Sequence, residues 1–159
     1  MNYTVDTLPL TAEAYEAVLP EMSREPEGAA AACVLALNII THDEHQGVES
    51  LKTMNPEISH SSIQLAVSQL RSKSYMLRSY FSGTSPENGY TIPEKMEMIF
   101  TTNRYSGSKE EGKIKLFMAC SGAASPRPVT LKRRNDGGWY AYEWSSLVVG
   151  VRAPEKKPD

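Results

Sequence analysis

The chain has 159 residues, of which 40% are hydrophobic and 23% are charged, and its formal net charge is −2. This length suits one domain with a sizeable core, and a net charge so near zero argues against a general binder of polyanions. No stretch is apolar for long enough to span a bilayer, and the N-terminus lacks the basic start and apolar run of a secretory signal. We therefore expect a cytoplasmic protein without membrane binding, with one α+β domain over residues 1–154 and a disordered tail at 155–159.

The first helix is expected after an extended segment at residues 1–10. Thr11 has the side chain of an N-cap, and the acidic residue two positions later favours the first turn of a helix. Because proline has no backbone N–H to donate within a helix, Pro20 is expected to close this one.

A second helix is expected to start near Pro26, since proline is favoured at the first helical position. The following stretch, Ala29–Ile40, is apolar at every position but one. A helix without a polar stripe normally lies at the centre of a small domain. We expect this helix to pack on the sheet face that carries Val129, Leu131 and Tyr142.

The two cysteines, Cys33 and Cys120, each belong to an apolar run. Their spacing fits neither a metal motif nor a disulfide framework, so we expect reduced, buried thiols. His42 and His45 are three residues apart and would share one face of a helix, with His60 as a third ligand only if the fold brings it close. Two histidines without a placed third ligand are weak evidence, so we predict no metal site and no cofactor.

Two further helices follow. One spans Glu44–Met54, with Thr41 or Asp43 as its N-cap and the histidines in solvent. The other is capped by Ser59 or Ser61 and shows apolar residues at helical spacing. The core face of that helix is predicted to consist of Ile63, Ala66, Val67 and Leu70.

The second half of the chain has the composition of strands separated by turn formers. Tyr75–Phe81 is rich in aromatic residues and is interpreted as the first strand, with a helical continuation as the alternative. A polar loop is expected at 104–112. The other predicted strands are Met96–Thr102, Ile114–Cys120, the two strands of a hairpin, and Leu147–Val151.

The hairpin is the strongest structural signal. Its strands are Val129–Arg134 and Trp139–Trp144, joined by Asn-Asp-Gly-Gly at 135–138, residues that tolerate the backbone angles of tight turns. A two-residue loop would place Lys132 close to Glu143, whereas a three-residue loop would reverse the faces. With the two-residue loop, the core face would carry Val129, Leu131, Tyr140, Tyr142 and Trp144, and the other face Thr130, Lys132, Trp139, Ala141 and Glu143. The basic run 132–134 is interpreted as a solvated hairpin end, and we predict no nucleic-acid binding.

Arg127 stands between two prolines that hold the backbone extended. One interpretation is the lead-in to an edge strand, with Arg127 in a surface ion pair. The other is an arginine positioned for a carboxylate or a phosphate.

Two motifs, SYFSGTSPENGY at 79–90 and SGAASPRPVTL at 121–131, resemble those of an uncharacterised bacterial domain family. The resemblance includes a closing W-x-x-E hairpin, for which Trp139 or Tyr140 with Glu143 is the counterpart. Ala124 stands where the family pattern leads us to expect aspartate. The resemblance implies no known activity. A looser likeness is to NTF2-like and cystatin-like folds, in which N-terminal helices pack on a curved antiparallel sheet, here of about four to six strands.

No nucleophile or phosphate-loop motif is present, which leaves two classes of function. The first is a binding or protein-interaction module that uses the loops 82–89 and 121–128. The second is a small lyase, isomerase or hydrolase with a sheet-lined cavity. We expect the two loops to lie side by side, with Arg127 bound to Glu87 or to loop carbonyls, or pointing into an open groove. The expected partner is a protein, a small acidic ligand or a second copy of the chain. The predicted binding residues are Glu87, Asn88, Tyr90, Arg127, Trp139 and Glu143.

Overall fold

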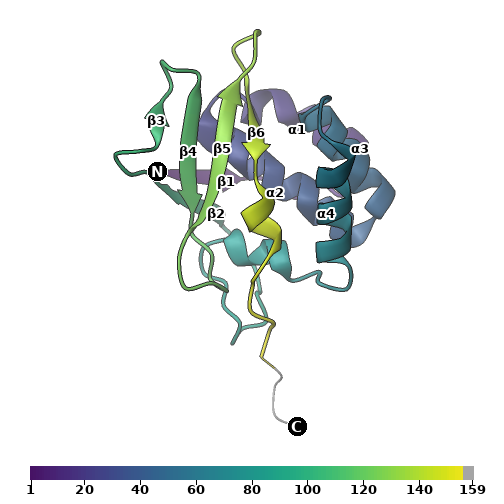
Figure 1. The fold of residues 1–159 in the computed structure, drawn as a ribbon. Helices are drawn as coiled ribbons and strands as arrows, with labels where there is room; N and C mark the ends of the chain where they lie inside the picture. Colours follow the sequence, from purple (N-terminus) through teal and green to yellow (C-terminus); the bar gives the residue numbers. More distant parts are fainter. Residues whose placement is uncertain (156–159) are drawn as a thin grey trace.

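The structure is a computed structural model that describes residues 1–155. Four α-helices gather against one side of an antiparallel sheet (Figure 1), which confirms the predicted α+β class with the helices N-terminal. Among these residues no helix combines the length and apolarity needed to cross a bilayer. The elements, in chain order, are β1 (Asn2–Val5), α1 (Ala12–Met22), α2 (Pro26–His42), α3 (Glu44–Met54), α4 (His60–Leu70), the 3-10 helix η1 (Met76–Tyr80), β2 (Met96–Thr101), β3 (Gly107–Ser108), β4 (Lys113–Met118), β5 (Arg127–Arg133), β6 (Trp139–Glu143) and the 3-10 helix η2 (Ser145–Val148).

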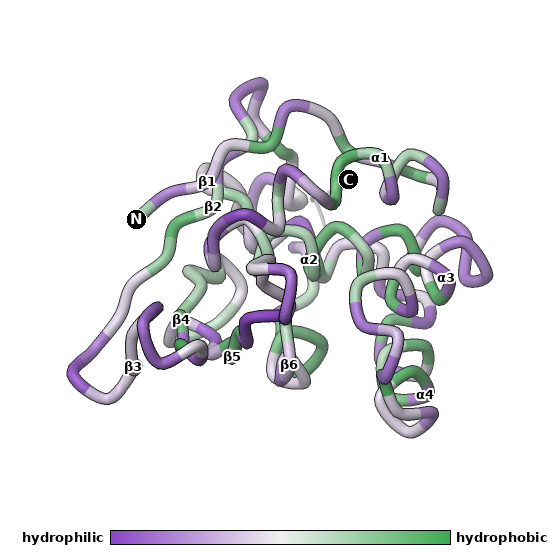
Figure 2. The backbone as a smooth tube through the Cα atoms, turned by 90° about the horizontal axis from the view of Figure 1, so that it is seen from above, coloured by the Kyte–Doolittle hydropathy of each residue, from purple (hydrophilic) through white to green (hydrophobic). Residues whose placement is uncertain are grey.

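Helix α2 is the centre of the molecule, as predicted. Every residue of Ala29–Ile40 is buried. Seen from above in Figure 2, α2 runs between the strands on one side and α3 and α4 on the other, and it contacts β4, β5 and β6. The helix covers the face that carries Val129 and Leu131, but the expected contact with Tyr142 is wrong because that side chain lies on the opposite, exposed face.

Local signals placed the starts of the other helices correctly. The side chains of Thr11, Asp43 and Ser59 accept hydrogen bonds from the first turns of α1, α3 and α4. The predicted core face of α4 is buried. Pro20, in contrast, lies inside α1, which continues for two residues beyond it. A proline so close to a helix end removes one hydrogen bond without ending the helix.

The strands follow the order β1-β2-β4-β5-β6, with β3 paired beside β2 on β4. Strand β5 is therefore internal, and its interpretation as an edge-strand lead-in is wrong. Pro128 is accommodated because its carbonyl accepts a hydrogen bond from the Ser146 hydroxyl on the η2 side. The backbone nitrogen and carbonyl of one residue in an antiparallel strand point to the same side. The nitrogen of Pro128 therefore also points towards η2, and its missing N–H removes no hydrogen bond to β4.

The predicted faces of the hairpin are wrong. Arg133 pairs with Trp139, so an odd number of residues, 134–138, connects the two strands. With an odd number, each residue of the second strand faces the side opposite to the one predicted for a two-residue loop. Leu131 consequently lies opposite Ala141, and both are buried with Trp139. A register shift between Thr130 and Leu131 then places Thr130 opposite Glu143. Lys132 does not meet Glu143; its ammonium nitrogen lies 3.4 Å from the centre of the Tyr142 ring.

Three segments differ from their predicted secondary structure. Asn2–Val5, expected as loose chain, pairs with β2. Met76–Tyr80, expected within a strand, forms the 3-10 helix η1, and the start of the expected strand Leu147–Val151 belongs to the 3-10 helix η2 (Ser145–Val148). These two helices contact each other, and the Tyr80 hydroxyl donates to the Leu147 carbonyl at 2.7 Å. Their apolar residues are buried on several sides, so the sequence shows neither the two-residue hydrophobic period of a strand nor the 3.6-residue period of an α-helix. The predicted loop at 104–112 contains β3, and all of the predicted tail except Glu155 lies outside the described residues.

Candidate functional site

The two motif loops lie in contact, as predicted. The hydroxyl oxygens of Thr84 and Ser121 are 2.8 Å apart, and the Ser121 amide donates to the Ser79 carbonyl at 2.8 Å. The loops enter and leave β-strands and η1 at one end of the molecule, which is why residues 82–89 and 121–128 meet there.

Asn88 organises the first loop. Its side-chain oxygen accepts from the amides of Ser85 and Thr91, and its side-chain nitrogen donates to the Gly83 carbonyl. The Asn88 amide in turn donates to the Ser85 hydroxyl at 3.1 Å. The side chain thus uses its carboxamide to hold the loop in one conformation, as Asn does in turns.

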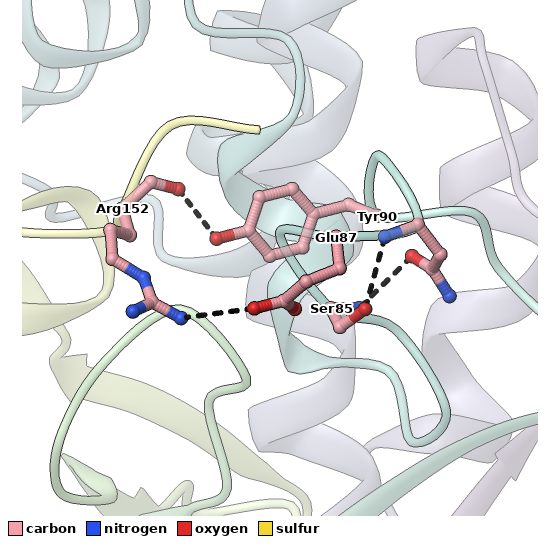
Figure 3. Close-up of polar contacts among 5 residues, drawn as sticks. Ser85, Glu87, Tyr90 and Arg152 are labelled. Atoms are coloured by element: carbon pink, nitrogen blue, oxygen red, sulfur yellow. Dashed lines mark hydrogen bonds and ion pairs between the residues drawn. The ribbon is translucent and has the colours of Figure 1, made fainter. Parts of the chain in front are cut away.

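Tyr90 fastens the loop to the C-terminal segment. Its ring is fully buried and stacks on Tyr75, with 5.7 Å between ring centroids. Its hydroxyl donates to the Arg152 carbonyl at 2.5 Å, a contact drawn in Figure 3. Tyr90 has a φ of 55°, which is uncommon for a bulky residue and is maintained here by the stacking and the hydrogen bond.

Gly122 allows the second loop to approach Tyr90. A Cβ at this position would lie 2.4 Å from the Tyr90 hydroxyl oxygen and 2.7 Å from a methyl carbon of Val151. The Gly122 carbonyl accepts a hydrogen bond from the Arg152 amide at 2.9 Å. Close backbone approach explains the glycine in the SGA motif.

Arg127 completes the arrangement. Its guanidinium donates to the carbonyls of Ser146, Val149 and Gly150 at 2.6–3.0 Å. It does not bind Glu87, and its carbonyl acceptors lie in the C-terminal segment and not in the two motif loops, so neither internal pairing expected for Arg127 is found. We call the contacts among 82–90, 121–128 and 146–155 the loop clasp.

Replacing Arg127 should loosen this clasp. We expect Arg127→Ala to lower the free energy of unfolding by about 1–3 kcal/mol, because three carbonyls, one of them partly buried, lose a charged donor. Arg127→Lys should recover only part of the loss, since an ammonium lacks the planar fork that reaches several acceptors. Denaturant unfolding measures both changes. Arg71→Ala, at an exposed position, is the control, and a loss at Arg127 no larger than at Arg71 would exclude the clasp role.

Glu87 and Arg152 remain exposed on the clasp. Their carboxylate and guanidinium groups are 4.0 Å apart, and the side chains are 60% and 67% exposed (Figure 3). An ion pair of this kind contributes at most about 1 kcal/mol to stability. Both charges are therefore available to a partner. The sequence did not predict Arg152 as a site residue, because it lies in a C-terminal segment rich in proline and charged residues that matches no motif.

Trp139 and Glu143 are not part of the clasp. Trp139 is buried near the hairpin turn, where its amide donates to the Ser23 carbonyl. Glu143 lies at the other end of β6 and accepts hydrogen bonds from the Ser145 hydroxyl and amide, which lower the pKa of its carboxyl group.

A cleft of about 180 Å³ opens beside the clasp. Its lining has no carboxylate, histidine or lysine among the described residues. Cys120 and Ser79 meet there, with 3.4 Å between sulfur and oxygen. The residues that line the cleft are Ser79, Tyr80, Phe81, Ser82, Gly83, Ile99, Ala119, Cys120 and Ser121.

The two thiols should therefore differ in reactivity. Cys33 is fully buried in α2, and burial raises the pKa of its thiol, whereas Cys120 is only half-buried in the cleft. We expect a thiol reagent to modify Cys120 in the folded protein and to reach Cys33 only after denaturation. Mass spectrometry of the modified peptides checks this, and equal modification of both in the folded state would contradict the placement of Cys33.

The histidines stay apart from this region. Within residues 1–155 no three His, Cys, Asp or Glu side chains gather in a group suited to a metal ion. His42 ends α2 and His45 lies in the first turn of α3. We still predict no specific zinc binding; stoichiometric binding that is lost in a His42→Ala, His45→Ala variant would disprove it.

Comparison with known proteins places the chain in a family. A model described as a domain of unknown function (DUF6935) matches residues 7–155. The chain belongs to this family. The match includes both motif loops and the whole clasp. No curated protein and no solved structure matches the chain.

Proposed function

We propose that the chain is a non-catalytic protein-interaction module whose binding surface is presented by the loops 82–89 and 121–128. The observation that carries this proposal is the loop clasp itself. Its buried groups bind one another, Glu87 and Arg152 remain exposed, and Ser82, Gly83 and Ser121 of the two loops help to line an open cleft. A surface already held in one conformation loses little entropy when a partner binds.

The size of the cleft favours a partner side chain as its occupant. Small-molecule sites usually enclose about 300–1,000 Å³, and this cleft encloses about 180 Å³. Phe81, Ile99 and Cys120 form its apolar part. Interfaces commonly depend on one apolar anchor that enters such a cavity, surrounded by polar contacts. Glu87 and Arg152 would then pair with charges on the partner.

The small-enzyme alternative has less support. An acid–base mechanism requires a titratable group within hydrogen-bond reach of the substrate, and the cleft offers only hydroxyl and thiol groups. Burial raises the pKa of the Tyr80 hydroxyl, which disfavours its ionised form. We therefore assign the cleft to binding.

We further propose that residues 1–154 act as one cytoplasmic domain. Two free cysteines, Cys33 and Cys120, fit a reducing compartment. The packing of N-terminal helices on an antiparallel sheet supports the NTF2-like or cystatin-like comparison.

A photocrosslinking amino acid tests the interaction surface. We expect its incorporation at exposed Ala124 to trap a partner in cells, whereas incorporation at Lys52 on α3 traps none. Ala119→Phe, which fills the cleft from an exposed position, and Glu87→Ala with Arg152→Ala should each abolish the crosslink without unfolding the protein. A crosslink unaffected by both changes, or one equally strong at Lys52, would overturn the proposal.

A further inference from the structure

The solvent-facing side of the sheet carries three lysines without carboxylate partners. Lys113 and Lys132 are direct cross-strand neighbours on β4 and β5, and Lys115 follows on the same face. Within residues 1–155 none of the three takes part in an ion pair. Like charges directly opposite each other destabilise a sheet. Since this arrangement does not favour folding, it suggests a negatively charged ligand.

A groove of about 270 Å³ lies against two of these lysines. Thr130 forms part of its wall, and although the residue as a whole is only 8% exposed, its hydroxyl oxygen is not one of the fully buried atoms that lack a partner. Because this hydroxyl makes no hydrogen bond to another described side chain and is open to the groove, it is available to a ligand there. The lining residues are Tyr105, Ser106, Gly107, Glu111, Lys113, Lys115 and Thr130.

An aromatic ring borders the same groove. Tyr105 is 78% exposed, although the Arg104 guanidinium lies 4.9 Å from the centre of its ring. A large exposed ring beside a basic groove is suited to stacking against a flat ligand group. The groove thus has a cationic wall formed by Lys113 and Lys115 and an aromatic border formed by Tyr105.

Two carboxylates limit the positive charge. Glu111 lines the groove, and Glu143 lies opposite Thr130. The Glu143 carboxylate already accepts two hydrogen bonds from Ser145. Two lysines, Lys113 and Lys115, line the groove against one carboxylate, Glu111, so the lining carries a net charge of one positive unit.

We propose that this groove binds a small phosphorylated ligand with a flat ring, of the nucleoside-phosphate type. Lys113 and Lys115 pair with the phosphate oxygens, the Thr130 hydroxyl donates to one of them, and the ring stacks on Tyr105. Lys132, whose ammonium lies over the Tyr142 ring, adds positive charge on the neighbouring strand but does not line the groove. Strand residues two apart are separated by about 7 Å, a span that a diphosphate bridges. The short cationic patch and the net charge of −2 disfavour a long nucleic-acid strand.

Calorimetric titration with ADP and with pyrophosphate tests this site on the whole chain. We expect both to bind, and ADP to bind more tightly because of the ring. Lys113→Ala with Lys115→Ala should raise the Kd for ADP by about tenfold or more, and Thr130→Val by about two- to tenfold. Tyr105→Ala should weaken ADP but leave pyrophosphate unchanged. NMR shifts on ADP addition should concentrate at 105–107, 113–115 and 130.

A matched control removes the same charge elsewhere. Lys52→Ala with Lys73→Ala changes two exposed lysines outside the sheet and should leave the Kd unchanged. Equal affinity of the groove and control variants would overturn the proposal, as would failure of the wild type to bind ADP or pyrophosphate. Binding of oligothymidylate or polyglutamate without ADP or pyrophosphate would replace the proposed ligand with an acidic polymer.

Discussion

Gly122→Ala is expected to lower the free energy of unfolding by about 2–4 kcal/mol. The added Cβ would lie 2.4 Å from the Tyr90 hydroxyl oxygen and 2.7 Å from Val151. To relieve this overlap, Tyr90 or the C-terminal segment must move, and the hydrogen bond from Tyr90 to the Arg152 carbonyl is lost. Urea unfolding followed by circular dichroism measures the change.

A double-mutant cycle locates the cause of that loss. Tyr90→Phe removes the oxygen that the new Cβ would overlap. The variant with Gly122→Ala and Tyr90→Phe should therefore be less destabilised than the sum of the single variants, by about 1 kcal/mol or more. Additive losses would mean that Gly122 is required for another reason than its approach to Tyr90.

Leu37→Ala is expected to cost about 2–5 kcal/mol, the range found when large buried side chains are truncated. Leu37 is fully buried in α2, the helix that lies between the sheet and the other helices (Figure 2). The truncation leaves a cavity where neighbours from both layers meet, and neither layer can close it alone. Thermal and denaturant unfolding report the loss.

Leu10→Ala is the control for this prediction. Leu10 is 49% exposed and precedes α1, so its truncation should change stability by about 0.5 kcal/mol or less. A loss below about 1 kcal/mol for Leu37→Ala would show that α2 is not the central helix.

The helices were predictable because their signals are local. Thr11 and Ser59 cap helices through contacts three residues away. Ala29–Ile40 needed only its composition to be recognised as a buried helix. Capping residues and apolar composition therefore predict these helices without knowledge of the tertiary contacts.

The faces of the hairpin were not predictable to the same degree. They depend on whether the loop has an odd or even number of residues, and residues 135–138 suit several turns. The register shift next to Thr130 changes the cross-strand pairing a second time, and the residues around it do not predict it. The β1 strand was missed because its partner, β2, is far away in sequence.

The motif loops were recognised, but not what their residues contact. The backbone around Arg127 was correctly expected to be extended, whereas its acceptors are carbonyls of a segment with no distinctive sequence. Tyr90 was predicted to bind a partner and instead lies buried against the Arg152 carbonyl. Contacts between distant segments require the tertiary structure.

Hydrogen exchange at the Arg152 amide tests the loop clasp most directly. This amide donates to the Gly122 carbonyl, whereas the Ala153 amide has no acceptor within residues 1–155. We predict that exchange at Arg152 is slowed by about 100-fold or more relative to an unfolded peptide, the factor that corresponds to an opening free energy of about 2.7 kcal/mol. In Arg127→Ala this protection should fall. Exchange at Arg152 as fast as at Ala153 in the wild type would contradict the clasp and the interaction surface built on it.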